Sequence, residues 1–190
     1  EHYLFPRPNL MNTCRFFVEH GAHAIICQHS HCAGCMEIYK DAPIIYGQGN
    51  LLFDMPSHYT TWHDGVLISL KIKNNGGFHA ELIPYRQSDG RPGASKMTQQ
   101  QETSFRNAFM DRSKSIQDET FVKKQWEIFC LKRKRYYLHT LQGNPGILRR
   151  LAGKLGLLDF VYSQKVQRAR LNLIQCESHR EALITLLSNG

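Results

Sequence analysis

Apolar residues in the first 85 positions recur with two different periods, one helical and one extended. A spacing near 3.6 predicts an amphipathic helix over residues 9–20, and Gly21 is a plausible stop for it. Its apolar positions are Leu10, Cys14, Phe17 and Val18. Short apolar runs then predict three strands, over residues 23–28, 36–39 and 43–47.

The next segment has the pattern of a β-hairpin. Residues 65–73 and 78–85 alternate apolar and polar positions. Between them lies Asn74-Asn75-Gly76-Gly77, a sequence that favours the tight turn of a hairpin. Residues 86–95 are rich in Gly, Pro and Ser, which indicates a linker.

The pattern changes after residue 95, where no comparable strand signal occurs. Helical periodicity predicts helices over residues 96–117, 118–140, 147–155, 163–175 and 177–188. The sequence therefore predicts a mixed α/β (α+β) protein. We expect an α/β part over residues 1–88, a linker over 89–95 and a small all-helical part over 96–190.

Composition limits the possible classes of protein. The chain has 190 residues, 42% of them hydrophobic and 21% charged, which is ordinary for one or two soluble globular domains. No apolar run approaches the roughly 20 residues of a membrane helix. The six cysteines lack the dense spacing of a disulfide scaffold, so we expect mostly free thiols and a reducing compartment.

The net charge of +8 is concentrated in one region. Residues 123–170 hold 12 of the 24 Lys and Arg residues and only two acidic residues, Glu127 and Asp159. The densest run is Lys132, Arg133, Lys134 and Arg135, followed by two tyrosines. Such a run can bind a polyanion, although a solvated helix face is the simpler interpretation. No helix-turn-helix or RNA-binding motif accompanies it, so we expect no nucleic-acid partner.

The clearest candidate for a metal-binding site is the segment Cys27-Gln28-His29-Ser30-His31, at the end of a predicted strand. Residues two apart on an extended chain point the same way, so His29 and His31 could face one metal ion. Imidazole suits zinc, iron, nickel and copper. The alternative is two loop histidines that bond to the backbone.

A second metal pattern overlaps the first. With Cys27, Cys32 and Cys35, the two histidines form C-x-H-x-H-C-x-x-C, which has the ligand content of a structural zinc module. The second ligand pair that would close a zinc ribbon or finger is missing from the sequence. The alternative is that these cysteines are small apolar filler.

The order of motifs from Glu1 to about Tyr85 resembles the bacterial capsule synthesis family, the CapA or poly-gamma-glutamate biosynthesis proteins. The resemblance is carried by four segments. They are Glu1-His2-Tyr3, the segment from Glu19 to Cys32, the segment from Ala42 through Asn50 to Asp54, and Leu82-Ile83-Pro84. It covers less than half of this chain. It implies the carboxyl-terminal half of a calcineurin-like metallophosphoesterase sandwich, and hence a fragment whose other half lies upstream.

The same resemblance suggests roles for individual residues. Glu1, His29 and His31 would be metal ligands and catalytic groups, for one or two divalent ions such as Mn, Fe, Zn or Mg. Independently of the resemblance, Asn50 and Asp54 follow the glycines at 47 and 49 and could orient the ligands through hydrogen bonds, as could Gln28. The alternative for Asn50 and Asp54 is that they cap a turn. Gln28 stands where the family has a histidine. His2 and His63 are weaker candidates for the site.

Three functions stay open at this level. The resemblance implies a metal-dependent, phosphoesterase-like hydrolase in capsule, polysaccharide or poly-gamma-glutamate biosynthesis. A non-catalytic assembly protein would instead bind an anionic polymer, glycan or lipid phosphate through residues 132–135. A structural zinc module is the third. We expect a bacterial protein, cytoplasmic or membrane-associated, whose fold an upstream segment or a dimer partner completes.

Overall fold

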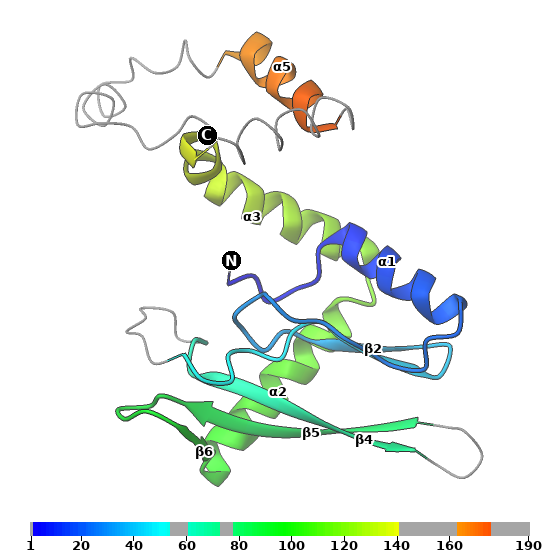
Figure 1. Cartoon of the computed structure of the whole chain (residues 1–190), viewed down its shortest axis with the longest axis vertical. Coiled ribbons are helices and arrows are strands. Elements are labelled where there is room, and N and C mark those ends of the chain that lie inside the picture. Colours follow the sequence, from blue (N-terminus) through cyan, green and yellow to red (C-terminus); the bar gives the residue numbers. More distant parts are fainter. Residues whose placement is uncertain (1, 54–60, 73–77, 141–162, 176–190) are drawn as a thin grey trace, which may run out of the picture. The chain divides into compact units, whose positions relative to one another are not determined.

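The computed structural model describes residues 2–53, 61–72, 78–140 and 163–175; for residues 134–140 only the course of the helix is described. The chain divides into two compact units, Glu1–Leu131 and Lys132–Gly190. The described part holds four helices and two three-stranded sheets, so the mixed α/β class is confirmed (Figure 1). The predicted helices over 147–155 and 177–188 lie outside the described residues.

The first sheet has the strand order β1-β3-β2. Strand β1 (Ile25–Ile26) runs parallel to β3 (Ala42–Ile45), and β2 (Met36–Tyr39) pairs with β3 in the antiparallel sense. Lys40 and Asp41 join β2 to β3 with φ angles of 46° and 64°, the left-handed pair that a tight hairpin turn requires. Helix α1 (Pro8–Glu19) precedes this sheet, close to its predicted bounds.

The second sheet has the order β4-β5-β6. Strands β4 (Asp64–Ile72) and β5 (Phe78–Gln87) form the predicted hairpin, with Val66 opposite Pro84 and Ile68 opposite Leu82. Strand β6 (Ala94–Lys96) pairs with the end of β5. The sequence did not predict β6, because its three exposed residues have no apolar face.

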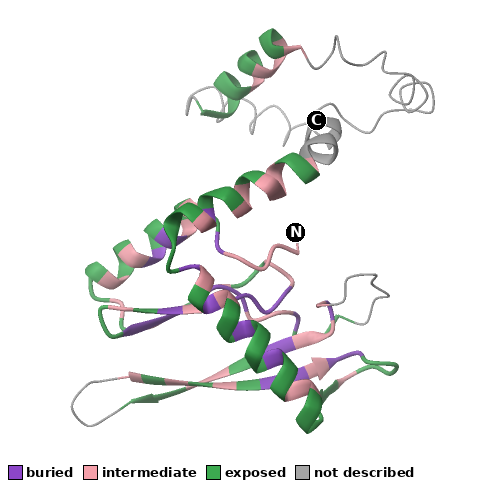
Figure 2. Cartoon of the chain, turned by 180° about the vertical axis from the view of Figure 1, so that it is seen from behind, coloured by how far each residue is buried: buried purple, intermediate pink, exposed green. Residues whose placement is uncertain are grey.

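Helix α2 (Gln99–Ser115) holds the two sheets together within the first unit. It begins with a capping box, in which Thr98 and Gln101 each bond to the other's backbone N–H. Its buried residues Phe105 and Phe109 pack with Val66, while Ser113 Oγ accepts a hydrogen bond from the N–H of Met36 on β2. Figure 2 shows α2 lying across both sheets. The first compact unit thus extends past residues 89–95, and the predicted division into an α/β part over 1–88 and a helical part over 96–190 stays a prediction.

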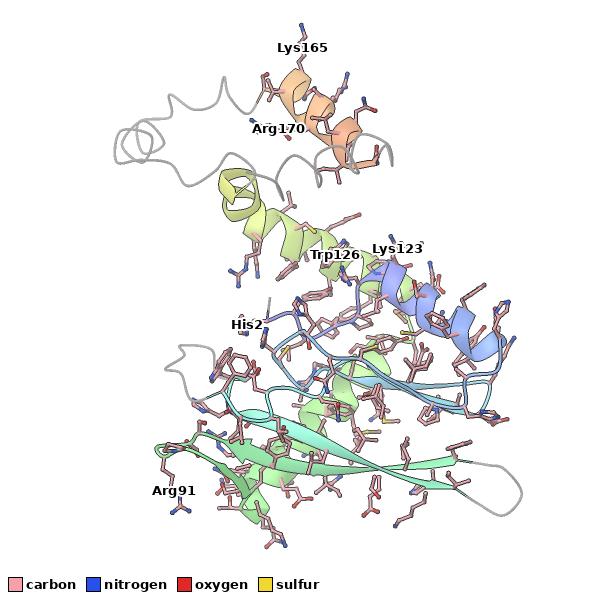
Figure 3. The ribbon with its side chains drawn as sticks, viewed as in Figure 1. His2, Arg91, Lys123, Trp126, Lys165 and Arg170 are labelled. Atoms are coloured by element: carbon pink, nitrogen blue, oxygen red, sulfur yellow. The ribbon has the colours of Figure 1, made fainter. Side chains whose placement is uncertain are left out.

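A second core lies between α1, the first sheet and the start of helix α3 (Glu119–Thr140). Its buried members are Met11, Cys14, Cys35, Ile44, Tyr46, Ile116 and Val122. Tyr3 packs on the same helix, with its ring centroid 4.7 Å from that of Phe129 and 5.4 Å from that of Trp126. Figure 3 shows the side chain of Trp126 on this helix. These contacts fix the segment that leads to His2.

In the second unit, the structure describes the end of α3 and helix α5 (Gln164–Gln175). Helix α5 matches the predicted range of 163–175 and has no buried residues. None of the helices in the described ranges is both long and apolar enough to span a membrane.

Candidate functional site

The histidine loop, residues 28–32, follows β1 and has a backbone that the sequence did not predict. His29 and His31 adopt left-handed φ angles of 80° and 58°, and β1 ends at Ile26. The expectation of an extended chain, with both rings on one side by alternation, is therefore wrong. The loop turns back on itself, and this turn brings the two ring centroids to 5.8 Å.

His31 lies at the centre of a group of rings. Its ring centroid is 5.8 Å from that of His2, 5.4 Å from that of Phe53 and 5.9 Å from that of Trp62, which is stacked on it. His31 is half-buried and His29 is exposed. The loop is further tied to the amino-terminal segment, because the N–H of His2 donates to the carbonyl of Ser30 over 3.0 Å.

Asn50 holds the ring of His31. Its Oδ1 lies 2.9 Å from His31 Nδ1, and its Nδ2 donates to the carbonyl of Trp62 over 3.3 Å. The second bond fixes which way the amide points, so Oδ1 is the atom that faces the imidazole. An amide oxygen only accepts, so His31 Nδ1 carries a proton, and in the neutral tautomer that fits this bond Nε2 has the lone pair.

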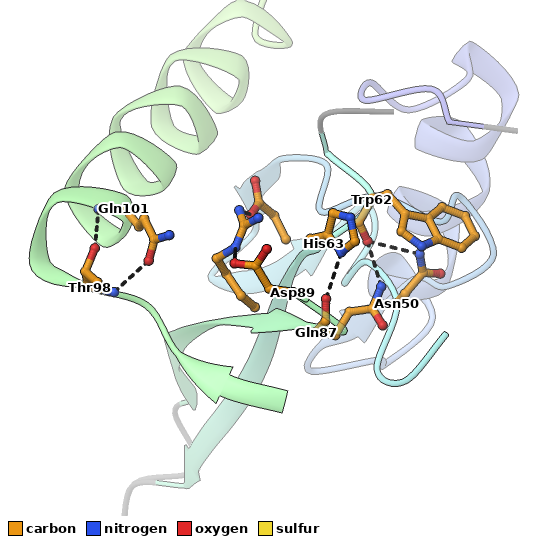
Figure 4. Close-up of polar contacts among 9 residues, drawn as sticks. Asn50, Trp62, His63, Gln87, Asp89, Thr98 and Gln101 are labelled. Carbon is orange, nitrogen blue, oxygen red and sulfur yellow. Dashed lines mark hydrogen bonds and ion pairs between the residues drawn. The ribbon is translucent and has the colours of Figure 1, made fainter. Parts of the chain in front are cut away.

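Asn50 is itself firmly placed. It is 3% exposed, and its carbonyl accepts a hydrogen bond of 2.8 Å from the hydroxyl of Tyr85. The carbonyl of Trp62 also receives a bond of 3.0 Å from Nε2 of the buried Gln87 (Figure 4). The imidazole of His31 is thus oriented by groups that cannot easily move.

The aromatic part of this site was missed by the sequence interpretation. Trp62 is buried, and its indole N–H has no hydrogen-bond partner in the described part of the chain. Phe53 packs edge-on against Trp62 at 5.7 Å. A Trp-His pair, here Trp62-His63, gives no sequence signal of its own, because only the fold brings it beside residue 31. His63 bonds elsewhere, through Nδ1 to the carbonyl of Gln87 at 2.9 Å.

The structure does not bring the other predicted site residues into the ring group around His31. Gln28 is exposed and bonds through its side chain to Gln48. Glu1 and Asp54 lie outside the described residues. Lys132 and Arg133 are on α3, the first exposed and the second half-buried, and the side chains of Lys134 and Arg135 lie outside the described part.

The cysteines of the possible zinc module point to different neighbours. Cys27 Sγ lies 3.6 Å from Sγ of Cys14 on α1. Cys32 and Cys35 are fully buried, and burial raises the pKa of the Cys35 thiol to about 12. Cys32 donates to the carbonyl of Tyr3 over 3.3 Å. These contacts are those of packed thiols.

The described residues do not supply enough ligands for a complete metal site. Within residues 2–53, 61–72, 78–133 and 163–175, no group of three or more His, Cys, Asp or Glu residues is placed to hold a metal ion. A catalytic zinc has about three protein ligands. His29 and His31 would therefore need a further ligand from outside these residues.

Comparison with known proteins identifies relatives of this chain. Residues 1–55 match the family model described as bacterial capsule synthesis protein PGA_cap. The chain is also similar to the capsule biosynthesis protein CapA of Bacillus anthracis, with 26% identity over 109 residues, which are 57% of this chain and 26% of that protein. The chain thus spans about a quarter of the length of the curated relative that it matches. The histidine loop and Asn50 fall within the residues matched by the family model, and this amino-terminal part of the chain is similar to the bacterial capsule synthesis proteins.

Proposed function

We propose that this chain is part of a capsule synthesis protein in which the histidine loop contributes to a metal-dependent, phosphoesterase-like site. The observation that carries the proposal is the bond from His31 Nδ1 to Asn50. Histidines that bind metals usually donate their other ring N–H to an oxygen acceptor, which fixes the ring and its tautomer. A histidine with only a packing role would not require its tautomer to be fixed.

The described residues supply two of the three ligands that a catalytic metal ion usually has. His31, through Nε2, and His29 would be two ligands, and Glu1 is the third group to which the family resemblance points. The bound ion would acidify a water molecule and neutralise charge on a phosphoryl group. The residues of this chain would hold the ring of His31 fixed through Asn50 and keep water from one side of it with the rings of Trp62 and Phe53. The indole N–H of Trp62 is buried and has no hydrogen-bond partner among the described residues.

The same proposal extends to the fold. The parallel pair β1–β3, followed by the antiparallel β2 and the β4–β5 hairpin, is compatible with the carboxyl-terminal half of a calcineurin-like sandwich. In that arrangement an upstream segment would complete the sheet and the metal site.

Metal titration tests the site. We expect Zn²⁺ or Mn²⁺ to perturb the ring signals of His29 and His31 in NMR spectra, and His31→Ala to weaken binding by about tenfold or more. Asn50→Ala, which keeps both imidazoles but frees the ring of His31, should weaken it by about 10- to 100-fold. His79→Ala, at an exposed position on β5, is the matched control. Binding that survives His31→Ala, or that Cys32→Ser abolishes, would contradict the proposal.

A second function is favoured by the charge of α3. Positions 132 and 135 are three residues apart in this helix, so they lie on the same side of it. We propose that this side binds an anionic polymer, glycan or lipid phosphate. Lys132→Glu combined with Arg135→Glu should abolish salt-sensitive binding to a polyanion such as heparin, whereas Lys123→Glu with Arg106→Glu, of equal charge change, should not. Equal loss in both variants would indicate a non-specific effect of net charge.

A further inference from the structure

Two cysteines that the proposed metal site does not use lie in contact with each other. Sγ of Cys14, on α1, is 3.6 Å from Sγ of Cys27, and a hydrogen bond joins the two thiols. A disulfide has an S–S length of about 2.05 Å, so the two sulfurs would have to approach by about 1.5 Å to form one. A shift of that size is within reach of side-chain rotation.

The backbone holds both members of this pair in place. Cys14 is 3% exposed and belongs to the core between α1 and the first sheet, and Cys27 packs against that core. The N–H of Cys27 donates to the carbonyl of Ile45 over 2.8 Å, just after β1 ends. The next residue, Gln28, is the first of the histidine loop. A bond between the two sulfurs would therefore tie α1 to the point from which the histidine loop departs.

The two thiols differ in exposure and in acidity. Cys27 is half-buried, and the hydrogen bond from Cys14 lowers its pKa, against the opposing effect of burial. The same hydrogen bond, burial and the nearby carboxylate of Glu37 all raise the pKa of Cys14. Cys27 is therefore the thiol that ionises and that solvent can reach, and Cys14 is its protonated, buried partner. An accessible, acidic cysteine beside a second cysteine is typical of redox-sensitive pairs.

The remaining cysteines of the described ranges lack this combination of properties. Burial raises the pKa of Cys32, Cys35 and Cys130, and the first two are fully buried. Thiols that stay protonated react slowly with oxidants, because the thiolate is the nucleophile. Cys176 lies outside the described residues. Among the five described cysteines, we therefore expect an oxidant to react first at Cys27.

We propose that Cys14 and Cys27 form a redox-sensitive pair, which a hydroperoxide converts to a reversible disulfide. The thiolate of Cys27 attacks one peroxide oxygen and becomes a sulfenic acid; the O–O bond breaks, and the other oxygen leaves with the proton that Cys27 lost on ionising. The sulfur of Cys14 then attacks that of Cys27, and its proton leaves with the hydroxide of the sulfenic acid as water. The two sulfurs thus give two electrons to the peroxide, and a thiol reductant restores them by exchange.

Peptide mapping by mass spectrometry tests this on the full chain, oxidised with hydrogen peroxide. Trypsin cuts after Arg15, so it separates Cys14 from a peptide of residues 16–40 that holds Cys27. We expect a disulfide to join the two peptides and dithiothreitol to remove it. Cys27→Ser should abolish the link, whereas Cys32→Ser, in the same peptide, should retain it. Absence of the link after oxidation, or its persistence in Cys27→Ser, would overturn the proposal.

The pair is independent of the proposed metal site, because no metal takes part in its oxidation. The mapping is therefore done with EDTA present, and His31→Ala should form the link as the parent does. Failure of the metal titration would leave this result unchanged, and loss of the link in His31→Ala would contradict the independence of the two.

Two further measurements test the order of the steps and the effect of the bond. In Cys14→Ser no second thiol can displace the hydroxide, so dimedone should label a sulfenic acid at Cys27, and this label should be lost in the parent. The oxidised parent should unfold at a higher urea concentration than the reduced parent, because the bond restricts the unfolded chain between residues 14 and 27. Equal labelling of Cys27 in both proteins, or a urea midpoint that does not rise, would refute the assignment. The second comparison uses the parent alone and needs no substitution in the core.

Discussion

Glu37→Gln is expected to lower the free energy of unfolding of the first unit by about 2 to 4 kcal/mol. Glu37 is the most deeply buried carboxylate of the described chain, with 3% of its side chain exposed. Arg15 donates to both of its oxygens, over 3.1 and 2.8 Å, and the hydroxyl of Tyr46 donates to it as well. Removing the charge leaves the Arg15 guanidinium, 21% exposed, without a close buried counter-charge.

The chain itself offers the control for this experiment. Arg15 also bonds to Glu119 over 3.2 Å, but that carboxylate is 66% exposed. Exposed ion pairs contribute only about 0 to 1 kcal/mol, so Glu119→Gln should change stability by less than about 1 kcal/mol. Urea denaturation of both variants measures the difference. Similar losses would show that burial of the pair has little effect on its strength.

Most of the secondary structure followed from periodicity. The helix over 9–20, the hairpin of 65–73 and 78–85, and the helices over 96–117 and 118–140 were each predicted within a few residues of their bounds. Helix α1 has a clear apolar face, and the Asn-Asn-Gly-Gly turn marks the hairpin, so both signals are local in the sequence. The strand predicted over 23–28 is shorter in the structure, because only Ile25 and Ile26 are in register with residues of β3, although the N–H of Cys27 still donates to the carbonyl of Ile45.

The sequence predicted which residues make up part of the candidate site, but not how the fold brings them together. The sequence indicated His29, His31 and Asn50, and the first two are close to each other in the structure, with Asn50 bonded to His31. The reason given for the first pair, alternation on a strand, was wrong, because both residues have left-handed backbones. The partners Trp62 and Gln87 come from distant positions and bear no local pattern. Whether these residues bind metal stays a prediction.

Gly47→Ala is expected to cost about 2 to 4 kcal/mol of stability and to disturb the histidine loop directly. Gly47 has a φ of 132°, and a Cβ there would lie 2.5 Å from Ser30 Oγ and 2.8 Å from the carbonyl oxygen of Cys32. Those two atoms are joined by a hydrogen bond of 2.9 Å that closes the loop around His31. The loop must therefore shift to make room for the methyl group.

Gly21→Ala separates backbone strain from this contact. Gly21 has a φ of 100°, and a Cβ there meets nothing within 4 Å, so the substitution should cost only about 1 to 2 kcal/mol. Denaturant unfolding and the ring NMR signals of His29 and His31 measure the two effects. We expect those signals to move in Gly47→Ala and to stay in Gly21→Ala, with metal binding reduced only in the former. Unchanged signals in both variants would mean that the close approach of Gly47 does not determine where the histidines lie, and that the ring geometry around His31 depends on Asn50 and Trp62 alone.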